Sequence, residues 1–249
     1  MPLTGASLAS PRVLFVYFTY RHRSLKVAEA MVDVLRARAC EVRLAPIDLT
    51  DSRYTARFTR FPLRHAVRDV LGMLPAQLLG ATGEIRIPVE VDGEYDLVIF
   101  GSPTWWLKTS LPLRAFLKSD TAGRLLEGKP FVALVVCRRY WRLNLHAVRR
   151  LGRRRGGRYV DGTHFAFAGG QVRSLLSLIS YLGTGENRDR YLAVKIPATN
   201  LQPGYLDQAR MFATELVATV DADAKPETNG VGWMAKRANV IPIRHGDRA

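Results

Sequence analysis

The sequence predicts an α/β protein with a doubly wound, mainly parallel sheet. Three runs rich in apolar residues, at 13–18, 96–100 and 131–136, have the composition of strands that are buried on both faces. Amphipathic helical patterns lie between these runs, and each run is followed by a loop with polar and aromatic residues. Strands and helices that alternate along a chain in this way form a parallel sheet with helices on both faces.

The elements follow one another in a regular order. After the strand at 13–18, a first helix presents Leu25, Ala28, Met31, Val32 and Leu35 on one face. A weaker second strand is expected at 41–48, and a fifth at 157–169. A helix begins at 111, and the last helix starts near Pro203, a residue type favoured at helix entry. Its apolar stripe consists of Leu206, Ala209, Ala213, Leu216, Val217 and Val220.

Two segments exceed a minimal five-strand alternation, and we interpret both as insertions into a single domain that spans 11–221. The first, about 51–90, predicts a helix that Pro75 stops. The second, about 169–200, carries an apolar helical face over 172–182. The "GTG" at 183–185 is interpreted as a turn, and the tail at 222–249 as an extended arm. The arginines of the first insertion have the spacing of one helical face: Arg53, Arg57, Arg60, Arg64 and Arg68.

Composition limits the classes of function. The chain has 249 residues, 47% of them hydrophobic, and 37 Lys+Arg against 22 Asp+Glu give a net charge of +15. This surplus favours an anionic partner or membrane surface. Specific nucleic-acid binding is not expected, because no reader motif accompanies the arginines. Two cysteines without metal-ligand spacing predict a reducing, cytoplasmic setting and no metal site. We expect no signal peptide and no bilayer-spanning segment, while peripheral membrane contact stays open.

The loops after the first, third and fourth strands carry the candidate chemistry. They converge because ligands of doubly wound sheets bind beyond the carboxyl ends of the strands, where the strand order reverses. The loop at 19–24 enters a helix N-terminus, which favours a phosphate, and Thr19 and Ser24 add hydroxyl donors. The loops at 102–109 and 137–141 add Trp105, Trp106 and Tyr140. A phosphate site between aromatic side chains suits a flat heteroaromatic ring that carries a phosphate.

Three loops in this order resemble the flavodoxin-like superfamily, especially flavodoxin-family proteins and NAD(P)H-dependent flavin reductases. Thr19 and Ser24 match the ends of that family's S/T-x-T-G-x-T phosphate loop, and "GSPTWW" resembles its second flavin-contacting loop. The resemblance covers 11–168 and the last helix. It implies the strand order 2-1-3-4-5, FMN as cofactor and NAD(P)H as electron donor. The candidate cofactor-binding residues are Thr19, Tyr20, Arg21, His22, Arg23, Ser24, Pro103, Thr104, Trp105, Trp106, Cys137, Arg138 and Tyr140.

The phosphate loop departs from the family pattern. Arg21 and His22 stand where the family has Thr and Gly, and Cys137, Arg138 and Arg139 replace small residues. Cations at a helix N-terminus are unfavourable unless an anion compensates them. The loop therefore holds either the FMN phosphate, with help from guanidinium groups, or a different anion. Cys137 itself is interpreted as a small buried residue at the end of a strand.

These observations lead to one main hypothesis and two alternatives. The main one is an FMN-binding oxidoreductase that reduces a quinone-like acceptor with NAD(P)H or a protein partner, beneath an apolar lid formed by the insertions. The net charge argues against a small shuttle flavodoxin, which in family terms is acidic. The alternatives are a flavin-free protein that binds another phosphorylated or acidic ligand, and a peripheral membrane module that uses the 172–182 face. A homodimer is left open, and no catalytic residue is identified.

Overall fold

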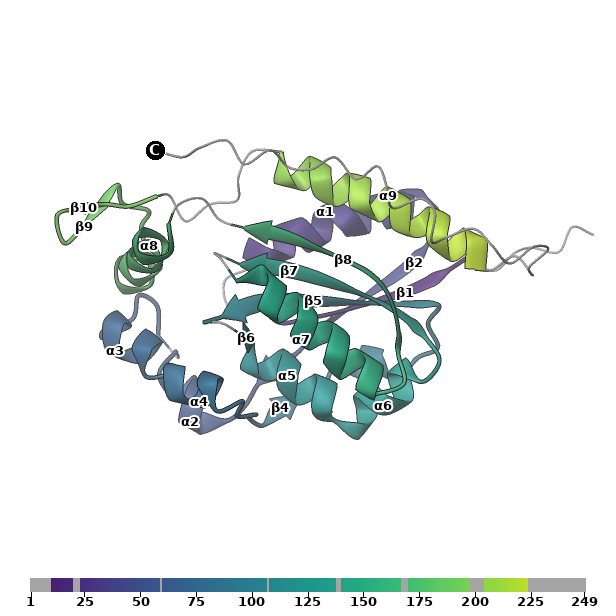
Figure 1. The fold of residues 1–249 in the computed structure, drawn as a ribbon, viewed down its shortest axis with the longest axis horizontal. Helices are drawn as coiled ribbons and strands as arrows, with labels where there is room; N and C mark the ends of the chain where they lie inside the picture. Colours follow the sequence, from purple (N-terminus) through teal and green to yellow (C-terminus); the bar gives the residue numbers. More distant parts are fainter. Residues whose placement is uncertain are drawn as a thin grey trace, which may run out of the picture.

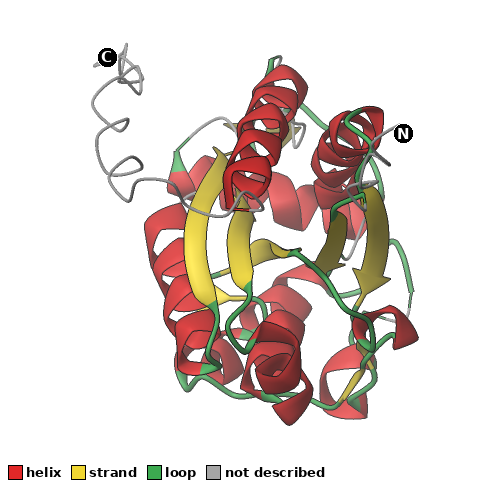
Figure 2. Ribbon diagram, turned by 90° about the vertical axis from the view of Figure 1, so that its right-hand side faces the viewer, coloured by secondary structure: helices red, strands yellow, loops and turns green. Residues whose placement is uncertain are grey.

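The computed structural model describes residues 10–19, 23–58, 60–106, 108–137, 140–166, 170–197 and 204–223, with the backbone alone at 23, 24, 171 and 219–223. Helices cover both faces of a central sheet (Figures 1 and 2). α1 (Arg23–Ala37) and α9 (Tyr205–Asp223) lie together on one face. α5 (Leu111–Lys118), α6 (Asp120–Leu126) and α7 (Trp141–Arg154) cover the other. The architecture is the predicted doubly wound one.

The sheet contains five parallel strands in the order β2-β1-β5-β7-β8. In chain order these main strands are numbered 2-1-3-4-5, so the predicted order is confirmed. A two-residue strand, β6 (Lys108–Thr109), pairs with the end of β5 in the antiparallel direction. The bounds of the main strands are β1 Arg12–Tyr17, β2 Glu41–Pro46, β5 Leu97–Trp105, β7 Pro130–Cys137 and β8 Arg158–Ala166.

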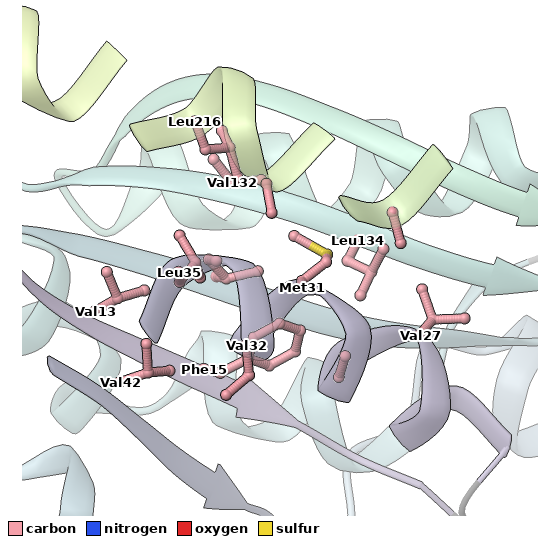
Figure 3. Packing of buried hydrophobic residues seen from close by; sticks show 14 of the residues in the cluster. Val13, Phe15, Val27, Met31, Val32, Leu35, Val42, Val132, Leu134 and Leu216 are labelled. Carbon is pink, nitrogen blue, oxygen red and sulfur yellow. The ribbon is translucent and has the colours of Figure 1, made fainter. Parts of the chain in front are cut away.

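Two hydrophobic cores explain the uninterrupted apolar runs. Successive side chains of a strand point to opposite faces, so a strand covered on both sides must be apolar throughout. On β1, Phe15 packs toward α1 and α9, where Met31 and Leu216 join it (Figure 3). Leu14 and Val16 pack on the other side, in the core shared with α5, α6 and α7. These three β1 side chains are fully buried, and the parallel pairing gives each core continuous apolar rows.

The first insertion forms a lobe that a short pair of strands connects to the rest of the domain. β3 (Asp48–Leu49) and β4 (Ile85–Arg86) pair in the antiparallel direction where the lobe leaves and rejoins the domain. Within it lie α2 (Ser52–Thr55), α3 (Ala66–Leu71) and α4 (Leu74–Leu78), and a 3₁₀ turn follows at Val89–Val91. Asp51 caps α2 and also accepts a hydrogen bond from the Glu84 amide at 3.3 Å, which links the two ends of the lobe.

Two sequence predictions for this lobe are wrong. Pro75 does not stop a helix, because it lies in the first turn of α4, where a proline lacks only an amide that has no partner within the helix. The arginines at 53, 57, 60, 64 and 68 do not share one helical face. α2 ends at Thr55 and α3 starts at Ala66, so these residues belong to different elements.

The second insertion packs on the first. α8 (Gln171–Thr184) contacts α3 through a third hydrophobic cluster that contains Leu63, Val70, Ile179 and Leu182. Val172 was predicted to share the buried face of α8, but its side chain is exposed. The predicted turn at 183–185 is found only at its last residue: Gly183 and Thr184 are the end of α8, and Gly185 ends the helix with a left-handed backbone.

After α8, the second insertion continues with a small hairpin. β9 (Arg190–Tyr191) and β10 (Val194–Lys195) form it. Pro203 and the tail beyond 223 lie outside the described residues. None of the helices in the described ranges combines the length and the apolar character that a bilayer span requires.

Candidate functional site

The carboxyl edge of the sheet contains the point where the strand order reverses. β1 is followed by α1 on one face, and its neighbour β5 leads to α5 on the opposite face. The connections after β1 and β5 therefore diverge, and the β7–α7 connection borders them. A crevice at such a switch point is where doubly wound proteins bind ligands. This edge is the candidate site, and the three predicted loops belong to it.

The loop after β1 is described in part. Thr19 follows the strand and is half-buried, while Tyr20, Arg21 and His22 lie outside the described residues. Arg23 and Ser24 form the first positions of α1, and only their backbone is described. The first turn of α1 contains no acidic side chain, so no carboxylate competes with an anion for the unpaired amides at this helix end.

The loop after β5 continues the strand beyond its β1 neighbour. Pairing with β1 ends at Gly101, and Pro103, Thr104 and Trp105 extend β5 to the edge. Trp105 packs edge-on against Phe18 at a centroid distance of 5.4 Å. Trp106 makes the turn into β6 and has a left-handed backbone with φ of 56°. Its half-buried ring packs against the α3–α8 cluster, so this loop joins the candidate site to both insertions.

The loop after β7 begins with a buried thiol and ends with an exposed ring. Cys137 is the last residue of β7 and is 3% exposed, as expected for a small side chain that closes a strand. Arg138 lies outside the described residues. Tyr140 is the N-cap of α7, is 39% exposed, and has a left-handed backbone with φ of 56° and ψ of 26°. A bulky residue rarely adopts this conformation, because the Cβ atom is crowded there.

A buried amide that the sequence analysis missed organises the loop after β5. The Oδ1 atom of Asn144, on α7, accepts hydrogen bonds from Ser102 Oγ at 3.0 Å and Thr109 Oγ1 at 2.8 Å. Its Nδ2 atom donates to Thr104 Oγ1 at 2.8 Å and to the Ser102 carbonyl at 3.5 Å. Asn144 is fully buried, and its amide thereby spans both sides of the β5–β6 turn. A satisfied buried network of this kind holds a loop in one conformation.

The sequence did contain a signal for this residue. Asn144, Val148 and Leu151 recur at helical spacing on the buried face of α7. A polar amide at an apolar stripe position requires hydrogen-bond partners inside the protein. The spacing therefore pointed to an internal polar contact, although it could not identify the partners on β5 and β6.

A second unpredicted pair lies near the end of β8. The His164 imidazole stacks on the Trp141 indole with a centroid distance of 3.7 Å and an interplanar angle of 12°. Burial, and secondarily the positive charge of Arg142, lowers the pKa of His164 from its ordinary value of 6.5. The imidazole is therefore neutral at pH 7. Within the described ranges, no group of three potential metal-ligating side chains comes together.

Comparison with known proteins adds structural relatives. No protein-family model and no curated protein matches the sequence. A flavoprotein in complex with FMN from Lactobacillus acidophilus NCFM is 15% identical, with a TM-score of 0.46 over 62% of this chain and 93% of that chain. A flavodoxin from the domain Archaea is 11% identical, with a TM-score of 0.47 over 84% and 99%.

A third solved structure completes the comparison. Oxidised flavodoxin 2 from Bacillus cereus is 16% identical, with a TM-score of 0.44 over 84% of this chain and 99% of that chain. These similarities are too distant to transfer a ligand or an activity. The strand order of the sheet itself, β2-β1-β5-β7-β8, identifies the fold as flavodoxin-like.

Proposed function

We propose that this protein binds FMN at the carboxyl edge of β1, β5 and β7 and acts as an oxidoreductase. One observation carries the proposal. Trp106 and Tyr140, in the loops that follow β5 and β7, both have a left-handed backbone at the carboxyl edge of the sheet, beside the point between β1 and β5 where the strand order reverses. Residues with large side chains in such conformations store strain, and strain of this kind concentrates at ligand sites. A flat ring is the ligand that aromatic side chains at this edge would suit.

The residue types in these loops have the chemistry that FMN requires. The FMN phosphate would lie at the N-terminus of α1, with the hydroxyls of Thr19 and Ser24 as donors and with guanidinium help from the same loop. Trp105, Trp106 and Tyr140 would flank the ring and exclude water from it. FMN, when bound, supplies one-electron and two-electron chemistry, and the protein contributes binding, orientation and electrostatics. Asn144 would act as a positioning residue, because it holds the β5–β6 turn that carries the tryptophans.

A titration with FMN tests the cofactor. Flavin fluorescence should be quenched by the nearby aromatic side chains, and Ser24→Ala should weaken binding by about 1.5–3 kcal/mol through loss of a hydrogen bond to a charged group. Ser52→Ala is the matched control, because Ser52 also lies in the first turn of a helix but in the insertion. The proposal fails if FMN does not bind at high micromolar concentration, or if both variants bind alike.

NAD(P)H as donor and a quinone-like acceptor are the finer part of the proposal. The net charge of +15 favours an anionic electron donor or partner, and α7 adds exposed Arg149, Arg150, Arg153 and Arg154. The α3–α8 cluster packs against Trp106, so apolar side chains border the proposed site. A hydrophobic acceptor would approach along them.

The acceptor is tested with two oxidants. NAD(P)H oxidation should be faster with short-chain quinones than with ferricyanide, and Leu176→Asp, a change at a half-buried position of α8, should slow the quinone reaction selectively. The association rate with the donor should fall as salt rises to physiological strength, where the screening length is about 8 Å. Equal turnover of both oxidants in both proteins would remove the quinone proposal and leave the FMN proposal intact.

The glycine-free loop at 19–24 favours one alternative function. Arg21, His22 and Arg23 replace the small residues that let a backbone wrap closely around a phosphate. A flavodoxin-like protein with such a loop could hold another phosphorylated or acidic ligand without a flavin. Failure of FMN binding, together with stabilisation by inorganic phosphate or a nucleotide in a thermal-shift assay, would support this second function.

A further inference from the structure

The segment formed by α3 and α4 carries apolar side chains on a buried face and also on an exposed one. Gly72 and Met73 keep a right-handed helical backbone between the two short helices, so helical spacing applies across 66–79. One stripe points inward and is buried: Leu63, Ala66, Val70, Met73 and Gln77. The other stripe is exposed, at 45% for Val67, 44% for Leu71, 49% for Leu78 and 86% for Leu79. Clustered exposed apolar side chains mark an interaction surface, and no other described element covers this outer stripe.

Positive charge surrounds the exposed stripe. Arg64, in the turn before α3, and Arg68, on α3 beside Val67, are both exposed. The ammonium of Lys108 lies against α4, where its Nζ donates to the Leu78 carbonyl at 2.7 Å.

Negative charge is nearly absent from the same stretch. Between positions 52 and 83 the sequence contains five arginines and a single acidic residue, Asp69. Its side chain is only 10% exposed and lies beside Arg68, at 3.7 Å from Nε. Arg53 is paired as well, with Asp51, which precedes this stretch. The solvent side of the lobe therefore combines apolar side chains with an excess of arginines over carboxylates.

We propose that this docking face, made of Arg64, Val67, Arg68, Leu71, Leu78 and Leu79, binds the surface of an anionic phospholipid bilayer. Leucine and valine side chains gain free energy by entering the boundary between lipid headgroups and acyl chains, and arginines gain it next to phosphate groups. A nucleic acid would use the arginines but would leave the leucines in water. The inference does not depend on FMN, since it uses only the outer side of the insertion.

The rest of the lobe supports this face as a rigid platform. α8 packs on the inner side of α3, and its Ile179 and Leu182 are buried there, so α3 covers this part of the 172–182 face predicted from the sequence as a membrane contact, while Val172 stays exposed. Arg114 of α5 binds the end of α4 and the loop that follows it. Its Nε and Nη2 atoms donate to the Ala81 carbonyl at 2.9 and 2.6 Å. Its Nη2 also donates to Gln77 Oε1 at 3.0 Å. These contacts hold the inner stripe against α8 and α5, and the outer stripe is therefore left facing solvent.

Co-sedimentation with lipid vesicles tests the apolar half of the proposal. The full chain should bind vesicles of phosphatidylcholine mixed with phosphatidylglycerol, and it should not bind phosphatidylcholine alone. Leu79→Asp should reduce the partition coefficient about tenfold or more, because one leucine no longer enters the bilayer boundary. Met211→Asp is the matched control, since Met211 is a 64% exposed apolar residue on α9, across the sheet, and this variant should bind like the wild type.

Charge reversal tests the other half. Arg64→Glu should weaken binding at least about fivefold, the effect of one cation near an anionic surface, whereas Arg150→Glu on α7 should leave it unchanged. High salt should reduce the wild-type affinity. Absence of binding to the anionic vesicles overturns the proposal, and so does binding that Leu79→Asp leaves unchanged. A wild-type dimer that Leu79→Asp converts to a monomer, without vesicle binding, would assign the face to a second copy of this chain instead.

Discussion

Asn144→Ala is the substitution that tests the organisation of the candidate site most directly. The change removes the amide that accepts from Ser102 and Thr109 and donates to Thr104. Ser102 and Thr109 are each 1% exposed, so water does not readily replace the lost partner. Each of the three short bonds contributes about 0.5–1.5 kcal/mol net, and each buried hydroxyl left unpaired costs about 1–3 kcal/mol. Ser102 Oγ keeps a long contact of 3.4 Å with the Pro103 carbonyl, which reduces its share.

The expected loss is about 3–5 kcal/mol in the free energy of unfolding. Urea denaturation measures it as a lower midpoint at an unchanged slope. Asn187→Ala, at an exposed asparagine after α8, is the control and should stay within about 0.5 kcal/mol of the wild type. In a double-mutant cycle, Asn144→Ala and Thr109→Val should couple by at least about 0.5 kcal/mol. A loss below about 1 kcal/mol, or additive effects of the two changes, would refute the claim that this network holds the β5–β6 turn.

Three further predictions concern single groups. Tyr140→Gly and Tyr140→Ala both remove the ring and should weaken FMN binding equally. In urea denaturation the glycine variant should be more stable by about 1 kcal/mol, because only glycine adopts φ of 56° without strain. Equal stability of the two variants would contradict the left-handed conformation. The hydrogen bond from Arg53 holds the pKa of Asp51 at about 2, below its value of 3.8 in an unfolded chain. This carboxylate therefore stabilises the fold above pH 3.8 and ceases to do so as pH falls toward 2. Asp51→Asn, with Asp48→Asn as the control, should flatten the fall of the melting temperature at acidic pH, and an unchanged fall would count against this role. The folded protein resists protonation of His164, whereas the unfolded chain accepts a proton near pH 6.5, so the stability of the fold should decrease as pH drops below that value. His164→Phe keeps a ring against Trp141 and should remove the His164 contribution to this decrease. A pH profile of the melting temperature that the substitution leaves unchanged would refute the lowered pKa of His164.

The sheet could be predicted because its signal is local. Residues buried on both faces of a strand are apolar at successive positions, so each run is visible in a short window of sequence. The ends of the strands were less visible. β5 was expected to end at 100 but continues to Trp105, because pairing with β7 and then β6 supplies hydrogen bonds after the apolar side chains stop. Gly101 and Ser102 carry no apolar signal, although both are buried.

The insertions could be predicted only as amphipathic segments. Helical periodicity persists across 66–79, because the backbone at Gly72 and Met73 stays helical, and this continuity hid the break between α3 and α4. The partners of each face were not predictable, since α3 and α8 are separated by about a hundred residues in the sequence. Long-range packing also explains why Asn144 was missed: its partners lie on β5 and β6, far along the chain.

The two proposals meet at α3. Its inner side packs with α8 in the cluster that includes the ring of Trp106, and Trp106 belongs to the loop after β5 that would flank FMN. Its outer side carries Val67 and Leu71 of the docking face.

Figure 1 shows α3 and α8 together at the end of the sheet toward which β5, β7 and β8 point. A bilayer bound to the docking face and a flavin bound at the switch point would thus lie on the two sides of α3 and the cluster behind it. Docking would therefore bring an acceptor dissolved in lipid near this edge of the sheet. This arrangement requires that vesicle-embedded quinone be reduced faster by the wild type than by Leu79→Asp, while a water-soluble quinone is reduced at the same rate by both. Equal rates with the embedded quinone, in a pair that differs in vesicle binding, would separate membrane docking from electron transfer.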